Sequence, residues 1–342
     1  MKQFLNKVVE NESLTMEEMQ EASNQMFEAK TSETEIGAFL TGLKMKGEKA
    51  EEIAGLVSVI REKSVAATNQ LTGVMDNCGT GGDRSQSFNI STTSAFVIAG
   101  AGIKIAKHGN RSISSKTGSA DVLEHLGVSL ETTKEHMLEL LEDNGIAFLF
   151  APNVHPDLKR IMKVRGDLKI PTIFNLIGPL TNPVRLDSQL LGIYRRDMLE
   201  MMASVLYKLG RKRAIVVNGA GHMDEASLAG DNHLVLMEEG ELIPFTLHPD
   251  EVGLPVYENS RIIGGDAKDN AEILHQVLKG QHGPYRDTVV LNAGLAILAN
   301  GKANTIQEGI ALAKESIDSG AALQKLENLI DFSKRHKREV IS

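Results

Sequence analysis

The sequence predicts an α/β fold in which a small all-helical N-terminal part precedes a larger part with a mostly parallel central sheet. From about residue 72 onward, short apolar runs alternate with helical stretches, and strands separated by helices are typical of a parallel sheet. Before that point the periodicity is helical throughout. We therefore expect a helical domain at 1–70 and an α/β domain at 71–342.

The N-terminal part carries two helix-start signals and two apolar stripes. Thr15 with Glu18, and Ser32 with Glu35, fit the capping box, in which each side chain bonds the other residue's backbone. Two sets of apolar residues recur at i, i+3, i+4 and i+7, and both predict core or interface faces: Ile36, Phe39, Leu40 and Leu43, and then Ile53, Leu56, Val57 and Ile60. The series Met16, Met19 and Met26 is also expected to lie in the core. A few short helices enclose little interior, so we expect this layer to pack on the rest of the chain or on a second subunit.

The larger part contains regular strand and helix signals. The apolar runs at 103–106, 147–150, 189–194 and 214–219 predict strands, and the segments near 92–101, 119–126, 197–209 and 268–279 predict helices. The segment at 233–247 instead predicts a hairpin that turns at Glu239 and Gly240. An antiparallel addition to the sheet is therefore expected.

Residues 76–121 carry most of the chemical information. Two glycine- and hydroxyl-rich loops, GTGGD (79–83) and KHGNRSISS (107–115), flank one apolar helical stretch. Backbone N–H groups in such loops form nests that bind anions, and Asn89, Ser91 and Thr92 stand at the helix start, where free N–H donors also favour anions. The segment holds five Lys or Arg against three Asp, in a chain of net charge −8. This balance indicates a small phosphorylated ligand rather than a nucleic acid, which needs a broad basic face.

Composition and hydrophobic pattern exclude several other classes of protein. No apolar run approaches the roughly 20 residues that span a bilayer, and the N-terminus lacks the apolar core of a secretory signal. The single cysteine, Cys78, excludes an internal disulfide and suits a reducing cytoplasm. Cys78 lies beside the first loop, where a nucleophile is one interpretation, but no base partner is evident and a packed small residue at a strand end is favoured.

The glycine loops do not fit the common nucleotide signatures, because GTGGD lacks the GK[ST] of a Walker A motif and the spacing of G-x-G-x-x-G. Together with FNIST (88–92), GSAD (118–121), VRGDLKIPTIFNLIGPLTNP (164–183) and the pair Asp224-Glu225, they occur in an order and spacing that resembles the anthranilate phosphoribosyltransferases. The resemblance covers essentially the whole chain. It implies a fold like that of the nucleoside phosphorylases, with helices from about 162–186 packing on the helical domain.

The resemblance implies a transfer of the phosphoribosyl group from 5-phosphoribosyl 1-pyrophosphate to the amine of anthranilate, with loss of pyrophosphate, a step of tryptophan biosynthesis. The implied donor-binding residues are Gly79, Gly82, Asp83, Ser87, Asn89, Ile90, Ser91, Thr92, Lys107, His108, Gly109, Asn110, Arg111, Ser112, Ile113, Ser114, Ser115 and Ser119. In this scheme the segment 107–115 is a flexible lid and Lys107 a mobile point charge.

The resemblance also implies a Mg²⁺ site at Ser91, Asp224 and Glu225, completed by pyrophosphate oxygens. Neighbours in a regular strand point to opposite faces, so both carboxylates serve one ion only if they lie in a turn, or else each holds a different ion. For anthranilate the implied contacts are Gly79, Asn110 and Arg165, the last gripping the carboxylate through two parallel hydrogen bonds.

No general base is assigned, because an aryl amine is already neutral at pH 7. Asp83, His108 and Glu225 are candidates only because their motifs lie close together. The chain departs from the family pattern at Arg84, where glycine is frequent, and at Ser87, where threonine is frequent. The family also implies a homodimer through the helical domain.

Two other interpretations stay open. The related pyrimidine nucleoside phosphorylases share the architecture but do not require the Asp224-Glu225 pair or the Arg165 segment in this form. A non-catalytic relative that binds nucleic acid would have eroded loops and a basic surface, whereas both loops here are complete and the chain is acidic.

Overall fold

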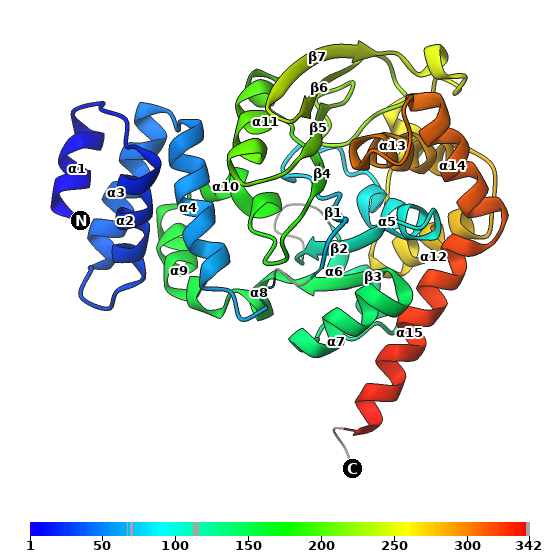
Figure 1. The fold of residues 1–342 in the computed structure, drawn as a ribbon, viewed down its shortest axis with the longest axis horizontal. Helices are drawn as coiled ribbons and strands as arrows, with labels where there is room; N and C mark the ends of the chain where they lie inside the picture. Colours follow the sequence, from blue (N-terminus) through cyan, green and yellow to red (C-terminus); the bar gives the residue numbers. More distant parts are fainter. Residues whose placement is uncertain (67, 69–70, 112–115, 340–342) are drawn as a thin grey trace.

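A seven-stranded sheet forms the centre of the larger part of the molecule (Figure 1). The structure is a computed structural model that describes residues 1–66, 68, 71–111 and 116–339. The strand order is β3-β2-β1-β4-β5-β6-β7, with bounds β1 Val74–Asp76, β2 Lys104–Gly109, β3 Ile146–Phe150, β4 Ser188–Gly192, β5 Arg213–Asn218, β6 Asn232–Glu238 and β7 Glu241–Leu247. The first five strands in that order run parallel, and β6 and β7 are antiparallel additions. The predicted mostly parallel sheet is confirmed.

The β6–β7 hairpin turns where the sequence predicts. Glu238 pairs with Glu241, which leaves Glu239 and Gly240 as the two turn residues. Both have positive φ, 48° and 95°, as a type I′ turn requires. Pro244 lies in β7 at the edge of the sheet, where the strand needs no further backbone donor.

Four helices form the N-terminal layer: α1 Lys2–Val9, α2 Met16–Phe27, α3 Glu33–Lys46 and α4 Ala50–Glu62. The two predicted capping boxes are present at the starts of α2 and α3. The predicted stripes on α3 and α4 are buried, as are Met19 and Met26, while Met16 is half-buried against the same core.

The remaining helices cover both faces of the sheet. Their bounds are α5 Ile90–Gly100, α6 Ser119–His125, α7 Lys134–Glu139, α8 Ala151–Val154, α9 Lys159–Leu168, α10 Phe174–Ile177, α11 Leu199–Lys208, α12 Ala267–Leu278, α13 Pro284–Asn300, α14 Ile306–Asp318 and α15 Ala321–Glu339. Short 3₁₀ turns lie at Pro156–Leu158, Gly178–Leu180, Arg196–Met198, Pro249–Val252 and Asn259–Ile262, and a π turn at Leu140–Asn144. No helix in the described part of the chain is long and apolar enough to cross a membrane.

Two hydrophobic cores meet at the sheet. Alternating residues of one strand enter different cores: Leu190 and Ile215 pack with α5 and α13, whereas Leu191 and Val216 pack with α11 and the N-terminal layer. This alternation follows from the two-residue period of a strand. The N-terminal helices therefore share their interior with one face of the sheet, and α9 and α10 contribute to that same interior.

A buried ion pair holds the N-terminal layer together. Glu52, at 0% exposure, accepts hydrogen bonds from Lys46 Nζ (2.9 Å) and from the backbone N–H groups of Leu14 (2.9 Å) and Lys49 (2.9 Å). One carboxylate thus joins the α1–α2 connection, the end of α3 and the start of α4. Burial of both charges makes the loss of one partner costly.

We predict that Glu52→Gln lowers the apparent free energy of unfolding by about 3 kcal/mol, because an amide cannot accept all three bonds and leaves Lys46 without its counter-charge. Urea denaturation followed by circular dichroism measures the change. Glu51→Gln is the matched control: Glu51 is half-exposed, pairs with Lys208 at 2.9 Å, and should cost less than about 1 kcal/mol. Equal losses in the two variants would contradict the role given to Glu52.

Candidate functional site

The carboxyl ends of β1, β2, β4 and β5 meet at one edge of the sheet, which is where open α/β sheets bind ligands. The connections that leave this edge are the glycine loop at 77–89, the segment after Gly109, the segment 193–196 and the loop 219–231. Thr80 N–H donates to the carbonyl of Gly192 (2.9 Å), and Gly81 N–H donates to Asp224 Oδ2 (2.6 Å). The glycine loop is therefore bonded both to the carboxyl end of β4 and to the loop 219–231.

The glycine loop has a backbone that most residues avoid. Gly81 and Gly82 have φ of 69° and 84°, and Arg84 has φ of 60°. The left-handed conformation at Arg84 gives a physical reason for the frequent glycine at this position of the family, and it costs an arginine about 1 kcal/mol. Asp83 stabilises the turn by accepting the N–H of Ser85 (3.1 Å).

Asp224 and Glu225 lie in a bend rather than in a strand, so their side chains are not forced to opposite faces. The bend packs directly on the neighbouring connections: a Cβ on Gly192 would overlap the Asp224 carbonyl, and one on Gly79 would overlap its carboxylate. Asp224 is buried. Only glycine permits this approach at either position.

The carboxylates in this bend are electrostatically crowded. Burial, then repulsion from Asp83, raises the pKa of Asp224 to about 7. Burial, then the charge of Asp224, raises the pKa of Glu225 well above its usual value, while Lys107 and a hydrogen bond from Ser91 act in the opposite direction. Ser91, Asp224 and Glu225 thus lie together. Within the described residues, no group of three or more His, Cys, Asp or Glu side chains is arranged to hold a metal alone.

The start of α5 faces this cluster with polar groups. Asn89 is the residue before the helix, and Ser91 and Thr92 lie in its first turn. Asn77 Nδ2 donates to the Ser91 carbonyl (2.8 Å), which fixes the helix start to the glycine loop. The buried oxygens Asn89 Oδ1 and Thr92 Oγ1 have no hydrogen-bond partner among the described residues. Such atoms are rare in native proteins and are typical of a site completed by a ligand.

Lys107 is not the mobile charge that the sequence suggested. Only 2% of it is exposed, because it lies within β2, and its Nζ is 3.4 Å from Ser91 Oγ. The expectation of a flexible segment beginning at Lys107 is therefore wrong: β2 continues through Gly109. Ser112, Ile113, Ser114 and Ser115 of the expected lid lie outside the described residues.

His108 is buried away from Lys107. Neighbouring strand residues point to opposite faces, and His108 Nδ1 is 3.2 Å from the Gly178 carbonyl, with its ring 5.5 Å from that of His155. Burial lowers the pKa of His108 to about 3, so the ring is neutral at pH 7 and is a weak base. The side chain faces the segment 178–183 and not the glycine loop, which does not favour a donor contact or a general-base role.

The residues after β2 are held by their own contacts. The Asn110 carbonyl accepts the Ser119 hydroxyl (3.2 Å), while the Asn110 side chain is exposed. Arg111 pairs with Asp121 (2.7 Å) and Glu124 (2.9 Å). The guanidinium of Arg111 is therefore already engaged by two acids on α6.

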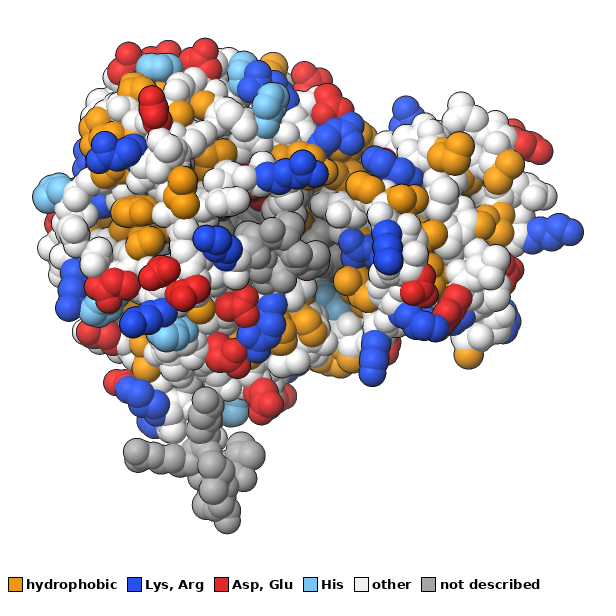
Figure 2. All heavy atoms as spheres, turned by 180° about the vertical axis from the view of Figure 1, so that it is seen from behind, with side chains coloured by type: hydrophobic (Ala, Val, Ile, Leu, Met, Phe, Trp, Pro, Cys, Tyr) orange, Lys and Arg blue, Asp and Glu red, His pale blue; other side chains and the backbone are white. Residues whose placement is uncertain are grey.

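Arg165 lies on α9, half-buried, over the ring of Phe174 at 5.2 Å. Its nearest polar contacts are Met162 Sδ (3.0 Å) and a long bond to Asn175 Oδ1 (3.4 Å). Figure 2 shows a hollow between the α/β part and the helical part, with several Lys and Arg side chains along its rim. Among the described residues, no hydrogen bond joins Arg165 to Asn110 or to the glycine loop.

Sequence reasoning missed the buried residues that support the site. Asp76 accepts bonds from the Asn77 N–H (2.8 Å) and from Asn182 Nδ2 (2.9 Å), so it ties the glycine loop to the segment 178–183. Asn292, on α13, bonds the backbone directly after Glu225. Asp76 could have been found from the sequence, because it directly precedes the glycine loop. Asn292 could not, because no sequence motif lies near it.

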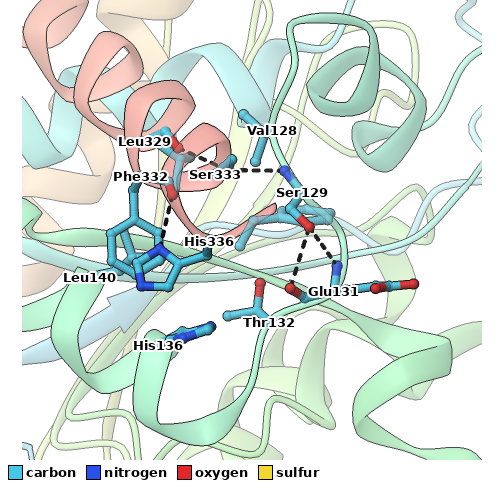
Figure 3. Close-up of a pocket in the computed structure, with 11 residues that line it drawn as sticks. Val128, Ser129, Glu131, Thr132, His136, Leu140, Leu329, Phe332, Ser333 and His336 are labelled. Atoms are coloured by element: carbon cyan, nitrogen blue, oxygen red, sulfur yellow. Dashed lines mark hydrogen bonds between the residues drawn. The ribbon is translucent and has the colours of Figure 1, made fainter. Parts of the chain in front are cut away.

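A separate small cavity lies between α7 and α15 (Figure 3). Its lining includes His136, Phe332 and His336, whose rings lie against one another, with centroids 4.2 Å apart for the two histidines. None of the site residues expected from the sequence lines this cavity.

Comparison with known proteins gives one consistent family. The model of a glycosyl transferase family matches in two parts, the helical bundle domain at residues 2–64 and the a/b domain at residues 71–323. The anthranilate phosphoribosyltransferase of Exiguobacterium sibiricum is 63% identical over 96% of this chain and 97% of its own.

Solved structures agree. The anthranilate phosphoribosyltransferase of Thermus thermophilus matches with a TM-score of 0.92 at 38% identity, covering 97% of this chain and 99% of its own. That of Saccharomyces cerevisiae, in complex with PRPP and Mg, matches with a TM-score of 0.88 at 29% identity, covering 97% of both chains.

The site makes a clear prediction for Cys78, which is half-buried and whose thiol lies 3.5 Å from the Gly79 carbonyl. Burial raises the pKa of this thiol to about 12, so at pH 8 it stays protonated and is not a nucleophile. We expect iodoacetamide at pH 8 to alkylate it at least about 100-fold more slowly than in the urea-unfolded chain, as mass spectrometry would show. Equal rates would contradict this environment.

Proposed function

The chain belongs to the anthranilate phosphoribosyltransferase family, and from this premise we propose how its sheet edge joins anthranilate to 5-phosphoribosyl 1-pyrophosphate. The observation that carries the proposal is that groups suited to an anion and groups suited to a cation lie side by side. The start of α5 and the glycine loop offer donors and unpartnered oxygens to a phosphorylated sugar, and the acidic bend beside them requires a cation.

The donor binds with its charged groups against the glycine loop and the start of α5. Gly79, Gly82 and Asp83 line the pyrophosphate and ribose, and Asn89, Ser91 and Thr92 contact phosphate. Buried Lys107 acts as a fixed positive charge below them, since its Nζ already lies beside Ser91. A fixed charge loses no conformational entropy when the substrate binds, so it favours binding more than a mobile charge does.

Mg²⁺ is held by Ser91, Asp224 and Glu225, with phosphate oxygens completing its shell. Magnesium characteristically uses one or two carboxylates together with substrate phosphates. This fits the described residues, among which no three His, Cys, Asp or Glu side chains are arranged to hold a metal alone. When bound, the ion neutralises charge on the departing pyrophosphate. The raised pKa values of Asp224 and Glu225 support this assignment, because a cation would relieve their repulsion.

Anthranilate binds on the helical side of the hollow between the α/β part and the helical part. Its carboxylate contacts Arg165, and Gly79 and Asn110 make further contacts. Arg165 is suited to this because its existing contacts are weak: a thioether sulfur and a 3.4 Å amide bond. Burial lowers its pKa, and a carboxylate partner would reverse that effect.

The reaction is attack by the anthranilate amine on C1 of the ribosyl group, with inversion. The C1–N bond forms as the C1–O bond to pyrophosphate breaks, and the new ammonium then gives up one proton. The amine lone pair is available at neutral pH, so this chain's residues chiefly position the reactants and stabilise the leaving group. The neutral, turned-away ring of His108 agrees with the absence of an assigned base.

The function is tested by anthranilate fluorescence, which has little background in a chain without Trp. We expect a decay that requires enzyme, donor and Mg²⁺ together and that releases pyrophosphate. Phosphorolysis of uridine or thymidine, with no such decay, would instead support a nucleoside phosphorylase.

The proposal also covers the domain division, the oligomeric state and the cellular compartment. We propose a division near residue 70, with the helical domain at 1–70 forming a homodimer, because α1 and α3 present Val9 and Met45 at 76% and 83% exposure. The single cysteine suits the cytoplasm.

For Arg165→Ala we predict a rise in KM for anthranilate of about 30-fold or more, while KM for the donor changes less than about 3-fold. The reason is the loss of a charge-assisted, two-bond contact to the acceptor alone. Steady-state kinetics with each substrate varied in turn measures both constants. Lys163→Ala, on the same helix and paired with Glu33 at the surface, is the matched control and should change neither. Equal effects on the two substrates would remove Arg165 from its assigned role.

For the assembly we predict a light-scattering mass near twice the 37.1 kDa of one chain, and a monomer for Met45→Glu. A charge placed in an apolar interface is expected to be strongly unfavourable. Val256→Glu changes an equally apolar exposed residue outside the helical layer and should leave the dimer intact. A monomeric wild-type chain would refute the proposed interface.

A further inference from the structure

We propose that Asn292 is a positioning residue for the metal-binding bend, acting through the backbone directly after Glu225. This inference rests on the proposed metal site at Asp224 and Glu225. Asn292 lies on α13, 1% exposed, and its role requires no contact with substrate or metal.

The contact is a two-bond clamp on a single residue. The Ala226 N–H donates to Asn292 Oδ1 (2.9 Å), and Asn292 Nδ2 donates back to the Ala226 carbonyl (2.8 Å). The side-chain amide thus satisfies both backbone groups of Ala226, as a neighbouring strand would. Ala226 is fully buried, so water cannot replace either bond.

The amide is itself held in one orientation. Asn292 Nδ2 also donates to the carbonyl of Thr288, one turn earlier on α13 (2.9 Å). Two carbonyls therefore face the nitrogen and one N–H faces the oxygen. The side chain cannot be flipped without placing its oxygen against both carbonyls, which fixes the clamp relative to the helix.

A second asparagine repeats the arrangement one residue later. The Ser227 N–H donates to Asn232 Oδ1 (2.7 Å), and Asn232 Nδ2 donates to the Ser227 carbonyl (2.9 Å). On the other side of the bend, Gly219 N–H donates to the Met223 carbonyl (2.9 Å). The backbone is thus anchored at 223 and again at 226 and 227, and the bend is confined to the two carboxylate residues.

This confinement explains why Asp224 and Glu225 are able to share one cation. Two adjacent residues converge only if the backbone between them is held in a conformation that an extended chain would not keep. Charge repulsion opposes that conformation, since the charge of Asp224 adds to the effect of burial in raising the pKa of Glu225. The clamp holds the carboxylates near the geometry that the cation needs, as residues behind metal ligands commonly do.

The test is Asn292→Asp, which keeps the size and one acceptor but loses the donor to Ala226 and Thr288. We expect Mn²⁺ affinity in the presence of pyrophosphate, measured by electron paramagnetic resonance, to fall about 10- to 100-fold. The Mg²⁺ concentration for half-maximal rate should rise by the same factor, while kcat at saturating Mg²⁺ stays within about 3-fold. Asn292→Ser, which is smaller, uncharged and too short to make both bonds to Ala226, serves if the carboxylate prevents folding.

The matched control is Asn144→Asp, in the π turn at Leu140–Asn144. Asn144 is also buried, and its Nδ2 donates to a backbone carbonyl, that of Lys325 (2.9 Å). It should lower thermal stability without changing Mn²⁺ affinity. An Asn292 variant that loses stability but binds Mn²⁺ like wild type would overturn the inference.

A parallel Asp224→Asn variant distinguishes failure of the Asn292 clamp from failure of the proposed metal site. If it weakens Mn²⁺ binding and the Asn292 variants do not, only the clamp is wrong. If it leaves Mn²⁺ binding unchanged, the proposed metal site itself is wrong.

Discussion

The site depends on the direct contact between the Asp224 bend and the backbones of Gly79 and Gly192. These three segments leave the sheet from different strands, and they touch with no room for a side chain at either glycine. The contact is reinforced by the bond from Gly81 N–H to the Asp224 carboxylate. The acidic bend and the glycine loop therefore have a fixed separation before any ligand arrives. Preorganisation of this kind saves the ordering free energy that a flexible site would lose on binding.

That contact creates an electrostatic problem that the fold does not solve by itself. Asp83, Asp224 and Glu225 crowd together, and burial disfavours the charge on Asp224 and Glu225, while Lys107 opposes part of this effect at Glu225. A phosphorylated ligand alone would add negative charge. In the part of the chain that the structure describes, no group of three or more His, Cys, Asp or Glu side chains is arranged to hold a cation alone. Under the proposed function, a cation and a phosphorylated ligand bound together would satisfy the acids, the unpartnered oxygens of Asn89 and Thr92 and the dipole of α5.

The parts of this structure that sequence predicts are those set by neighbours along the chain. The capping boxes of α2 and α3 and the hairpin turn at Glu239 and Gly240 depend on residues within four positions of one another. The end of β2 was misjudged because Lys107 and His108 look like loop residues, and their burial depends on pairing with β3, some forty residues away. Asn292 lies 66 positions from Ala226, and a single polar residue in an apolar helix gives no indication of its partner.

The shared core links the helix that carries Arg165, the proposed acceptor contact, to the strands that carry the acidic bend. Arg165 is carried by α9, whose apolar face packs with the N-terminal layer, and that layer packs on the same face of β4 and β5 as α11 does. The other face of those strands packs with α13, which carries Asn292. One pair of strands is therefore common to the proposed acceptor and metal sites. Its carboxyl ends carry Gly192 and the acidic bend, and the cores on its two faces include the helices that bear Arg165 and Asn292.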